Sequence, residues 1–304
     1  MTAPGMALPL LLLAGFVGHP SPQAAQPYRI AVTVDLVVLN ATVQDRKGRF
    51  ASDLHEQDFE IYEDGVRQSV RLFRHEDIPV AVGLVVDHSG SMRPKLSHVI
   101  AAARTFVESS SPEDQMFVVN FNEHVTLGLP DGISFSNRPD ELAHAIFNTP
   151  ATGKTALYDA ILEARKRLQT ADRNKKVLIV ISDGGDNASA HSLSDVLRMA
   201  GQSAILVYTI GIFDDADEDR NPDVLRRLAH STGGEADFPT QADELVAICD
   251  RIARDIRHQY TLGYVASNVG KAGYRTIQVI AHHKGKSKLV VRTRPGYIAA
   301  GAAQ

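Results

Sequence analysis

The sequence predicts an α/β protein whose main part is a doubly wound, mostly parallel sheet, accompanied by a small flanking β-sandwich. Between residues 80 and 258, apolar strand-like runs alternate with helical patterns, as in parallel sheets covered by helices on both faces. Residues 28–76 and 260–299 instead carry only β-like patterns. Each of these segments, about 45 residues long, is too short to bury a core alone. We therefore predict one discontinuous β-sandwich, with two separate β modules as the alternative.

The flanking segments show short strand patterns separated by turn residues. The first segment is rich in Val and Ile, and Asp64-Gly65 lies between two strand-like runs. Both residues accept positive φ, which indicates a hairpin. Three more strand-like runs follow Tyr260, at residues 260–267, 274–283 and 287–297.

The central segment contains four apolar strand patterns and five helical patterns. The strands are expected at 78–87, 115–122, 175–183 and 204–212. The helices are expected at 94–110, 155–169, 192–202, 221–234 and 242–259. A short run at 124–130 is expected to pair back on the second strand.

The N-terminus resembles a secretory signal peptide, which we place at residues 1–25. The apolar run at 6–18 is too short to span a bilayer comfortably, and small residues follow at Ala24 and Ala25. No Lys or Arg precedes the run, so a disordered apolar tail or a misassigned start is the alternative. We expect a secreted or periplasmic, envelope-located protein with no transmembrane segment in the mature chain. Cys249 is the only cysteine, which excludes an intrachain disulfide.

Charge and composition do not favour nucleic acid as a partner. The net charge of the chain is −4, and the sequence contains no tryptophan. Nucleic-acid binding would favour a basic stripe and aromatic side chains for stacking.

Oxygen-bearing side chains follow three of the predicted elements. Asp87, Ser89 and Ser91 end the first strand, Thr155 opens a helix, and Asp183 ends another strand. The carboxyl ends of parallel strands converge at one edge of a sheet, where ligands bind. Carboxylates and hydroxyls suit Mg²⁺, Mn²⁺ or Ca²⁺ better than zinc, which favours Cys and His. Taken alone, the first three residues are equally compatible with a helix cap near Pro94.

The stretches "DHSGSM", "TGKTALYDA" and "SDGGD" resemble the metal-ion-dependent adhesion site of von Willebrand factor A domains. The resemblance extends from about residue 80 to 256, and the flanking segments resemble a bacterial subgroup of secreted proteins with such domains. It implies that Ser89 and Ser91 bind Mg²⁺ directly, while Asp87 and Asp183 act through water. Thr155 occupies the position of a threonine that binds or withdraws according to the ligand state.

The resemblance implies a protein-binding module rather than an enzyme. With hydroxyls as most of its ligands, the cation would accept an Asp or Glu carboxylate from a partner protein. In family members this binding can couple to a shift of the last helix, here about 241–258. A structural or assembly role for the metal, and a metal-dependent hydrolase, are the alternative functions.

Other motifs are interpreted as structural. A phosphate-binding loop around "GKT" would need Gly at position 148, which is Asn. The acidic run 214–220 lacks the Gly and Glu of a calcium loop and is expected to be solvated. Asp186 is expected in a turn or in solvent, and His88, His282 and His283 at the surface. Ser89 lacks the G-x-S-x-G elbow of a hydrolase nucleophile.

Overall fold

The computed structural model describes residues 36–213, 220–241, 243–267, 272–283 and 288–299, which belong to one compact unit. The predicted signal peptide and the acidic residues 214–219 lie outside the described residues. Within the described parts of the chain, no helix is both long and apolar enough to cross a membrane.

A six-stranded sheet forms the centre of the predicted α/β segment, in the order β10-β9-β8-β5-β6-β7. Its strands are β5 (Val80–Asp87), β6 (Gln115–Phe121), β7 (Val125–Leu127), β8 (Lys175–Ser182), β9 (Leu206–Gly211) and β10 (Ala236–Asp237). Neighbouring strands are parallel except β6 and β7, which pair antiparallel as predicted. The first strand, β5, lies between β6 and β8, so the strand order reverses beside it. Such a reversal opens a crevice at the carboxyl ends of the strands.

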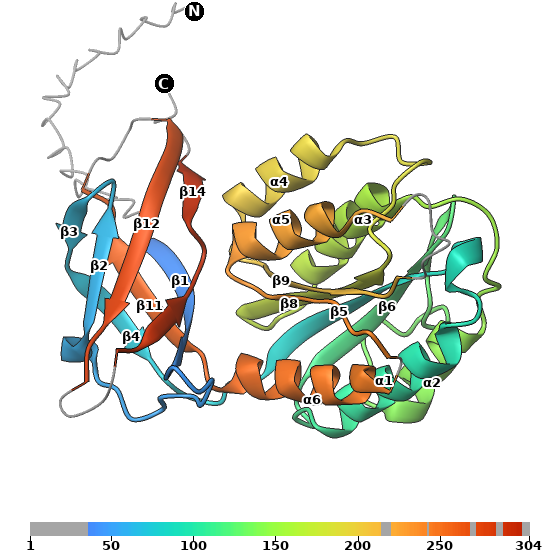
Figure 1. The fold of residues 1–304 in the computed structure, drawn as a ribbon, viewed down its shortest axis with the longest axis horizontal. Helices are drawn as coiled ribbons and strands as arrows, with labels where there is room; N and C mark the ends of the chain where they lie inside the picture. The colour runs from blue at the N-terminus through green and yellow to red at the C-terminus, as the bar shows by residue number, and fades with distance from the viewer. Residues whose placement is uncertain (1–35, 214–219, 242, 268–271, 284–287, 300–304) are drawn as a thin grey trace, which may run out of the picture. The chain divides into compact units, whose positions relative to one another are not determined.

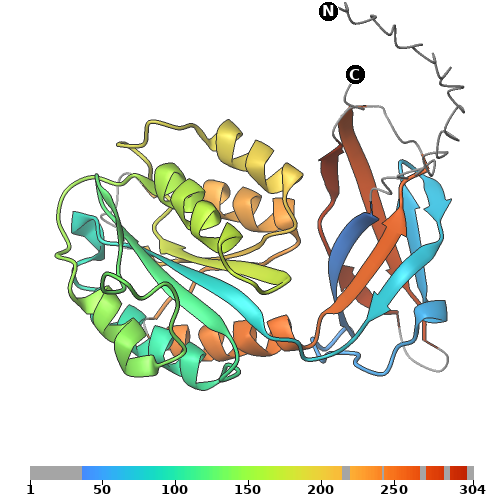
Figure 2. The same cartoon turned by 180° about the vertical axis from the view of Figure 1, so that it is seen from behind.

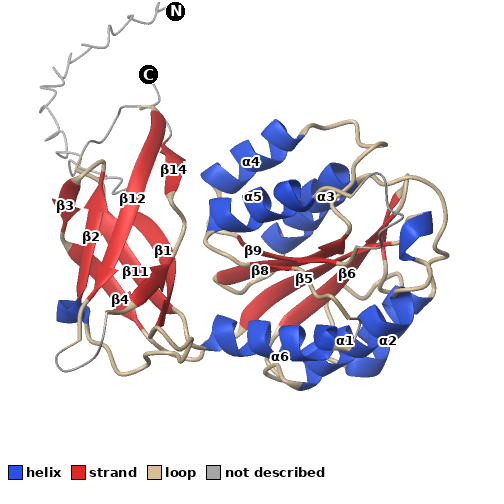
Figure 3. Cartoon of the chain, in the orientation of Figure 1, coloured by secondary structure: helices blue, strands red, loops and turns tan. Residues whose placement is uncertain are grey.

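Helices cover both faces of this sheet, which confirms the predicted doubly wound α/β class (Figures 1 and 3). The helices are α1 (Leu96–Glu108), α2 (Pro139–Phe147), α3 (Leu157–Gln169), α4 (Leu193–Gln202), α5 (Pro222–Thr232) and α6 (Glu244–Arg257). Helices α1, α2 and α6 lie on one face, and α3, α4 and α5 on the other. Local sequence fixes several ends: Ser192 and Asp195 form a capping box at α4, and Gly233 ends α5 in the left-handed region.

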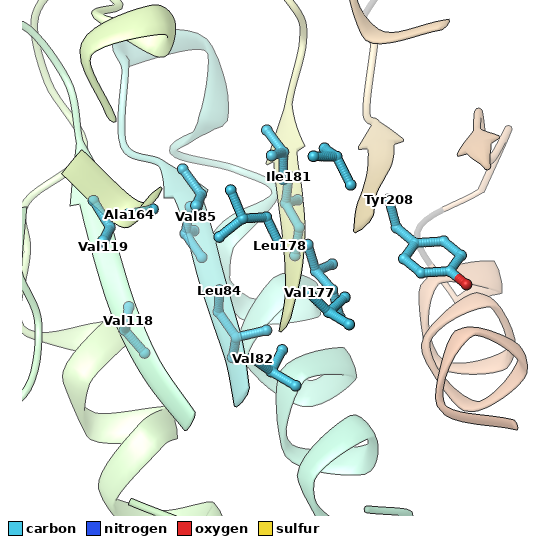
Figure 4. Close-up of a cluster of buried hydrophobic side chains, with 14 of the residues drawn as sticks. Val82, Leu84, Val85, Val118, Val119, Ala164, Val177, Leu178, Ile181 and Tyr208 are labelled. Atoms are coloured by element: carbon cyan, nitrogen blue, oxygen red, sulfur yellow. The ribbon is translucent and has the colours of Figure 1, made fainter. Parts of the chain in front are cut away.

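The core of the sheet consists of aliphatic side chains from its central strands (Figure 4). All residues of β5 are buried, because the strand is covered on both faces. Val85, Val119 and Leu178 lie among the labelled side chains of this cluster, and each is at most 1% exposed. The continuous apolar runs therefore correspond to the buried parallel strands that they predict.

Strands from the two ends of the chain pair with one another in two antiparallel sheets (Figure 2). The orders are β13-β1-β11-β4 and β14-β12-β2-β3. The strands are β1 (Leu36–Gln44), β2 (Phe59–Glu63), β3 (Val66–Gln68), β4 (Val70–Arg74), β11 (Tyr260–Val265), β12 (Gly273–Ala281), β13 (Val290–Arg292) and β14 (Gly296–Ala299). The hairpin between β2 and β3 turns at Asp64 and Gly65, both with positive φ, as predicted.

These two sheets share a second hydrophobic core, separate from that of the central sheet. Its most buried members include Leu39, Ile61, Tyr260 and Leu262. The register aligns Leu39 of β1 with Leu262 of β11, so residues from opposite ends of the sequence lie side by side. The division of the chain into a discontinuous sandwich (28–76 and 260–299) and an α/β domain (80–258) stays a prediction.

A buried polar cluster surrounds Asp255 in the last turn of α6. The Asp255 carboxylate accepts hydrogen bonds from the Thr42 hydroxyl and the Tyr208 hydroxyl, each at 2.7 Å. It also pairs with the Arg292 guanidinium. Asp255 is 1% exposed, so its charge is compensated entirely by neighbouring side chains.

Two elements of the central segment are absent from the sequence-based prediction. Helix α2 begins at Pro139 and buries Leu142, Ala145 and Ile146. The helix is only nine residues long and lies between loop segments, so its few apolar residues did not form a recognisable helical pattern. Strand β10 has two residues and pairs with β9. A strand of two residues is too short to show an alternating sequence pattern.

Candidate metal centre

Three loops meet at the carboxyl-end edge of the central sheet. Loop 1 (residues 87–92) follows β5 and includes the 3₁₀ turn η2 (Gly90–Met92). Loop 2 (149–156) precedes α3, and loop 3 (182–189) follows β8. The Gly90 N–H donates to the Gly153 carbonyl at 3.3 Å, and the Thr152 N–H donates to the His88 carbonyl at 2.9 Å. Loops 1 and 2 are therefore fixed to one another by backbone hydrogen bonds.

Asp87 ends β5 and is fully buried. Its Oδ1 accepts the Ser89 N–H at 2.7 Å, and its Oδ2 accepts the Ser182 hydroxyl at 2.6 Å. Burial raises the pKa of the Asp87 carboxyl to about 6, although the Ser182 hydrogen bond opposes the rise. The charge of Asp183 raises this pKa further. Among the described residues, no side-chain cation forms an ion pair with Asp87, so its negative charge is uncompensated.

Ser89, Ser91 and Asp183 form a chain of oxygen atoms beside Asp87. The Ser89 and Ser91 hydroxyl oxygens are 3.1 Å apart, and the Ser91 hydroxyl donates to Asp183 Oδ2 at 2.7 Å. The other carboxylate oxygen of Asp183 accepts the Gly185 N–H at 3.1 Å. Ser89 and Asp183 are buried, and Ser91 is partly exposed. The structure thus brings these three predicted residues into direct contact.

Thr155 lies on loop 2 and is attached to loop 3 through its backbone. Its N–H donates to the Asn187 side-chain oxygen at 3.0 Å, and its carbonyl accepts the N–H groups of Asn187 and Ala188. Thr155 is buried, but its hydroxyl forms no hydrogen bond with the other four predicted residues in the part of the chain described. The structure therefore places Thr155 on the adjoining loop without contact between its hydroxyl and the other site oxygens.

Sequence reasoning missed two residues that shape this centre. Ser182 donates to Asp87 and also accepts the Gly184 N–H at 3.1 Å. The sequence feature that could have identified Ser182 is a hydroxyl residue at the end of an apolar strand, directly before Asp183. Asn187 holds Thr155, and its place in "SDGGDN" carried no distinctive spacing.

The expectation that His88 lies at the surface is wrong. His88 is fully buried, and its ring nitrogens lie 3.1 Å from the Val86 carbonyl and 3.0 Å from the Ile146 carbonyl. Ile146 belongs to the last turn of α2, and the His88 carbonyl accepts the N–H of Thr152 on loop 2. Both ring nitrogens face backbone carbonyls, so His88 is a structural residue and does not contact the Ser89 hydroxyl.

Asp186, which we expected in a turn or in solvent, lies in loop 3 outside any assigned turn and is half-buried. Its carboxylate accepts the Tyr158 N–H at 3.0 Å and the Ser189 hydroxyl at 2.6 Å. It therefore caps the first turn of α3, next to loop 2.

The donor set fits a hard divalent cation. In the described residues, no group of three or more His, Cys, Asp or Glu side chains could hold a metal, so the hydroxyls would have to contribute ligands. Two neighbouring oxygens in an octahedral Mg²⁺ shell, each about 2.1 Å from the metal, lie about 3 Å apart. The separation of 3.1 Å between the Ser89 and Ser91 oxygens is compatible with that spacing.

Comparison with known proteins identifies the fold. The family model of the von Willebrand factor type A domain matches residues 82–248. The chain is similar to a solved von Willebrand factor type A structure from Catenulispora acidiphila, with 14% identity and a TM-score of 0.52, covering 87% of this chain and 72% of that one. Comparison with curated proteins finds no match.

The chain is also similar to two further solved structures. Proximal thread matrix protein 1 from the mussel byssus has 15% identity and a TM-score of 0.50, covering 60% of this chain and 49% of that one. The conserved hypothetical protein BatB from Bacteroides thetaiotaomicron has 15% identity and a TM-score of 0.47, covering 58% of this chain and 98% of that one.

Proposed function

Because the chain belongs to the von Willebrand factor type A domain family, we propose that it binds a partner protein through a divalent cation at loops 1, 2 and 3. Domains of this family are mostly non-catalytic adhesion or interaction modules. The single observation that carries the proposal is the uncompensated buried charge of Asp87 beside the oxygen chain of Ser89, Ser91 and Asp183.

In this proposal the hydroxyls of Ser89, Ser91 and Thr155 hold the cation directly. The carboxylates of Asp87 and Asp183 stand behind them, because each already accepts hydrogen bonds from the protein. A bound cation supplies a Lewis-acidic position for an Asp or Glu carboxylate of the partner. With neutral hydroxyls as ligands, the cation keeps more of its charge for that carboxylate.

Mg²⁺ is the cation that we propose first, with Mn²⁺ or Ca²⁺ as substitutes. All five side chains offer oxygen atoms, which these hard cations prefer. We infer that the protein acts outside the cytoplasm, as a secreted or envelope protein, from the signal-like residues 6–18.

The test is capture of a partner from an envelope and secreted-protein extract of the source organism. We expect the immobilised full chain to retain a partner in MgCl₂, release it in EDTA and regain it when MgCl₂ is restored. Ser89→Ala should retain none, whereas Ser97→Ala, an exposed hydroxyl on α1, should behave like the wild type. Capture that survives both EDTA and Ser89→Ala would contradict the proposal.

A second candidate function is structural, with the cation only joining the three loops. The favouring observation is again Asp87, since a cation near this buried charge would stabilise the fold without any partner. Under this alternative, chelation lowers the melting temperature, while partner binding by the folded protein does not respond to EDTA.

A further inference from the structure

We propose that Glu123 is a positioning residue of the metal centre. Its carboxylate fixes the backbone beside Thr155 and thereby sets the position of the Thr155 hydroxyl. Glu123 lies outside the five predicted site residues, in the hairpin turn formed by residues 122–124 between β6 and β7. The inference rests on the proposed function, and it adds a residue that acts on the cation through loop 2.

The hairpin turn emerges at the same edge of the central sheet as loop 1. The register pairs Phe121, the last residue of β6, with Asp87, the last residue of β5. The His88 N–H donates to the Phe121 carbonyl at 2.6 Å, which holds the two strand ends together. The residues that follow Phe121 therefore leave the sheet beside the metal loops.

Hydrogen bonds within the hairpin turn fix its backbone. The His124 N–H donates to the Asn122 side-chain oxygen at 2.8 Å, which is the pattern of an Asx turn. The Asn122 N–H donates to the His124 carbonyl at 3.1 Å. Glu123 lies between these two residues, so the base of its side chain has a defined place.

Two hydrogen bonds connect the hairpin turn to loop 2, one on each side of Thr155. The Glu123 carboxylate accepts the Lys154 N–H at 2.9 Å. The Asn122 carbonyl accepts the Ala156 N–H at 2.7 Å. The N–H of Thr155 itself donates to a side chain of loop 3. Three consecutive N–H groups of loop 2 are thus held by the two neighbouring loops.

Loop 2 also provides the space that the Glu123 carboxylate occupies. Gly153 has a φ of +82°, and a Cβ atom at this residue would overlap the Glu123 carboxylate. Glycine is therefore needed here both for the left-handed backbone and for the close approach of Glu123. The glycine of the "TGKT" stretch and the glutamate after β6 together form one contact.

A fixed loop 2 favours cation binding. Mg²⁺ requires near-octahedral geometry, with its ligands about 2.0–2.1 Å away. A loop that moves freely must be ordered when the cation binds, and this ordering lowers the affinity. Because Glu123 holds loop 2 before the cation arrives, less ordering is required of Thr155.

The experiment compares three variants of the full chain. Glu123→Ala removes the acceptor of the Lys154 N–H, whereas Glu123→Gln keeps a side-chain oxygen that can accept it. Asp131→Ala, the matched control, removes another exposed carboxylate, from the loop after β7. Glu123 is also exposed, so we expect every variant to fold, as verified by circular dichroism.

The first readout is hydrogen exchange of residues 149–156 in EDTA, which requires no cation. We expect Glu123→Ala to speed the exchange of loop 2 about tenfold, the order expected when one hydrogen bond to a charged acceptor is lost. Glu123→Gln and Asp131→Ala should exchange like the wild type.

The second readout is Mg²⁺ affinity, measured by calorimetric titration of the EDTA-stripped protein with MgCl₂. We expect Glu123→Ala to bind Mg²⁺ about tenfold more weakly than the wild type. Glu123→Gln and Asp131→Ala should bind within about twofold of the wild type. A residue that only stabilised the fold would change neither the exchange of loop 2 alone nor the Mg²⁺ affinity.

Four results would contradict these expectations, with different consequences. Wild-type Mg²⁺ affinity in Glu123→Ala would overturn the positioning role, with or without faster exchange, and leave the proposed function intact. Equal losses of affinity in Glu123→Ala and either Glu123→Gln or Asp131→Ala would also overturn it, because negative charge rather than the hydrogen bond would then matter. Absence of Mg²⁺ binding by the wild type would contradict the proposed function itself.

Discussion

Two buried carboxylates at opposite ends of the central sheet differ in how their charge is compensated. Asp255 is surrounded by the Arg292 guanidinium and the hydroxyls of Thr42 and Tyr208. Asp87 is equally buried, but among the described residues it is hydrogen-bonded by Ser89 and Ser182 and pairs with no cationic side chain. A buried charge is costly unless it is paired. We propose that the protein completes one carboxylate site with its own atoms, whereas the other is completed by an external cation.

The largest expected effect tests the completed site. Arg292→Met removes the cation that pairs with Asp255, which is 1% exposed. We expect the free energy of unfolding to fall by about 3–5 kcal/mol, because a buried charge is left without its partner. Urea unfolding followed by circular dichroism measures the change.

The control for that variant is Arg254→Met, which breaks an exposed ion pair with Asp250 on the same helix. Such pairs contribute about 0–1 kcal/mol, so little change is expected. Equal losses in the two variants would show that the Asp255 site needs no internal cation, and the contrast with Asp87 would disappear.

The second effect is the pH dependence of stability that arises from Asp87. Burial raises the pKa of Asp87 from 3.8 to about 6, so the folded state favours the protonated carboxyl. A raised pKa contributes stability below the unfolded value, and this stability is lost as the pH rises through about 6. In EDTA, we expect the stability of the wild type relative to Asp87→Asn to fall by about 2.5 kcal/mol between about pH 4 and pH 8.

Urea unfolding of both proteins over that pH range provides the measurement. Taking the difference between the two proteins cancels the titration of the other carboxylates. A difference that stays constant with pH would mean that Asp87 ionises without cost, and that it does not need a cation.

The third effect concerns Ser182, which donates to Asp87 and accepts the Gly184 N–H. Ser182→Ala should lower the free energy of unfolding by about 2 kcal/mol, since both buried partners lose a hydrogen bond. The Ser231 hydroxyl donates to the Leu228 carbonyl, its single hydrogen bond among the described residues, so Ser231→Ala should cost less than about 1 kcal/mol. Similar losses in thermal or urea unfolding would remove the special role of Ser182.

The smallest effect concerns loop 2. Gly153 has a φ of +82°, and the Glu123 carboxylate occupies the space that a Cβ would need. Gly132 has a φ of +85° with open space around it. Each glycine-to-alanine change should cost about 1 kcal/mol of stability through the backbone. Only Gly153→Ala should also weaken Mg²⁺ binding measured by calorimetry, because it displaces the loop that carries Thr155; equal Mg²⁺ affinities would refute this.

Much of the fold follows from sequence periodicity, and the contrast between the two carboxylates does not. The apolar run ending at Asp87 predicted both a buried strand and a polar edge, because covered parallel strands need continuous apolar residues. The sequence could not show that Asp255, one acid in an amphipathic helix, is buried against Thr42 and Arg292. Those partners lie more than 30 residues away along the chain, and only tertiary packing brings them together.

The candidate site was predictable in its residue types and only partly in its contacts. Spacing predicted that Asp87, Ser89, Ser91 and Asp183 converge, since strand ends of a parallel sheet share one edge. It could not show that His88, one residue from Asp87, turns inward to two backbone carbonyls. Such orientations depend on the path of loop 2, which no local pattern encodes.

The most direct test of the central claim is the effect of Mg²⁺ on the stability of the full chain at neutral pH. We predict that MgCl₂ at about 100 times its dissociation constant raises the free energy of unfolding of the EDTA-stripped protein by about 2.7 kcal/mol. Asp87→Asn should show no such rise, although it folds. Equal stability of the wild-type protein with and without MgCl₂ would contradict the claim that the Asp87 site is completed by an external cation.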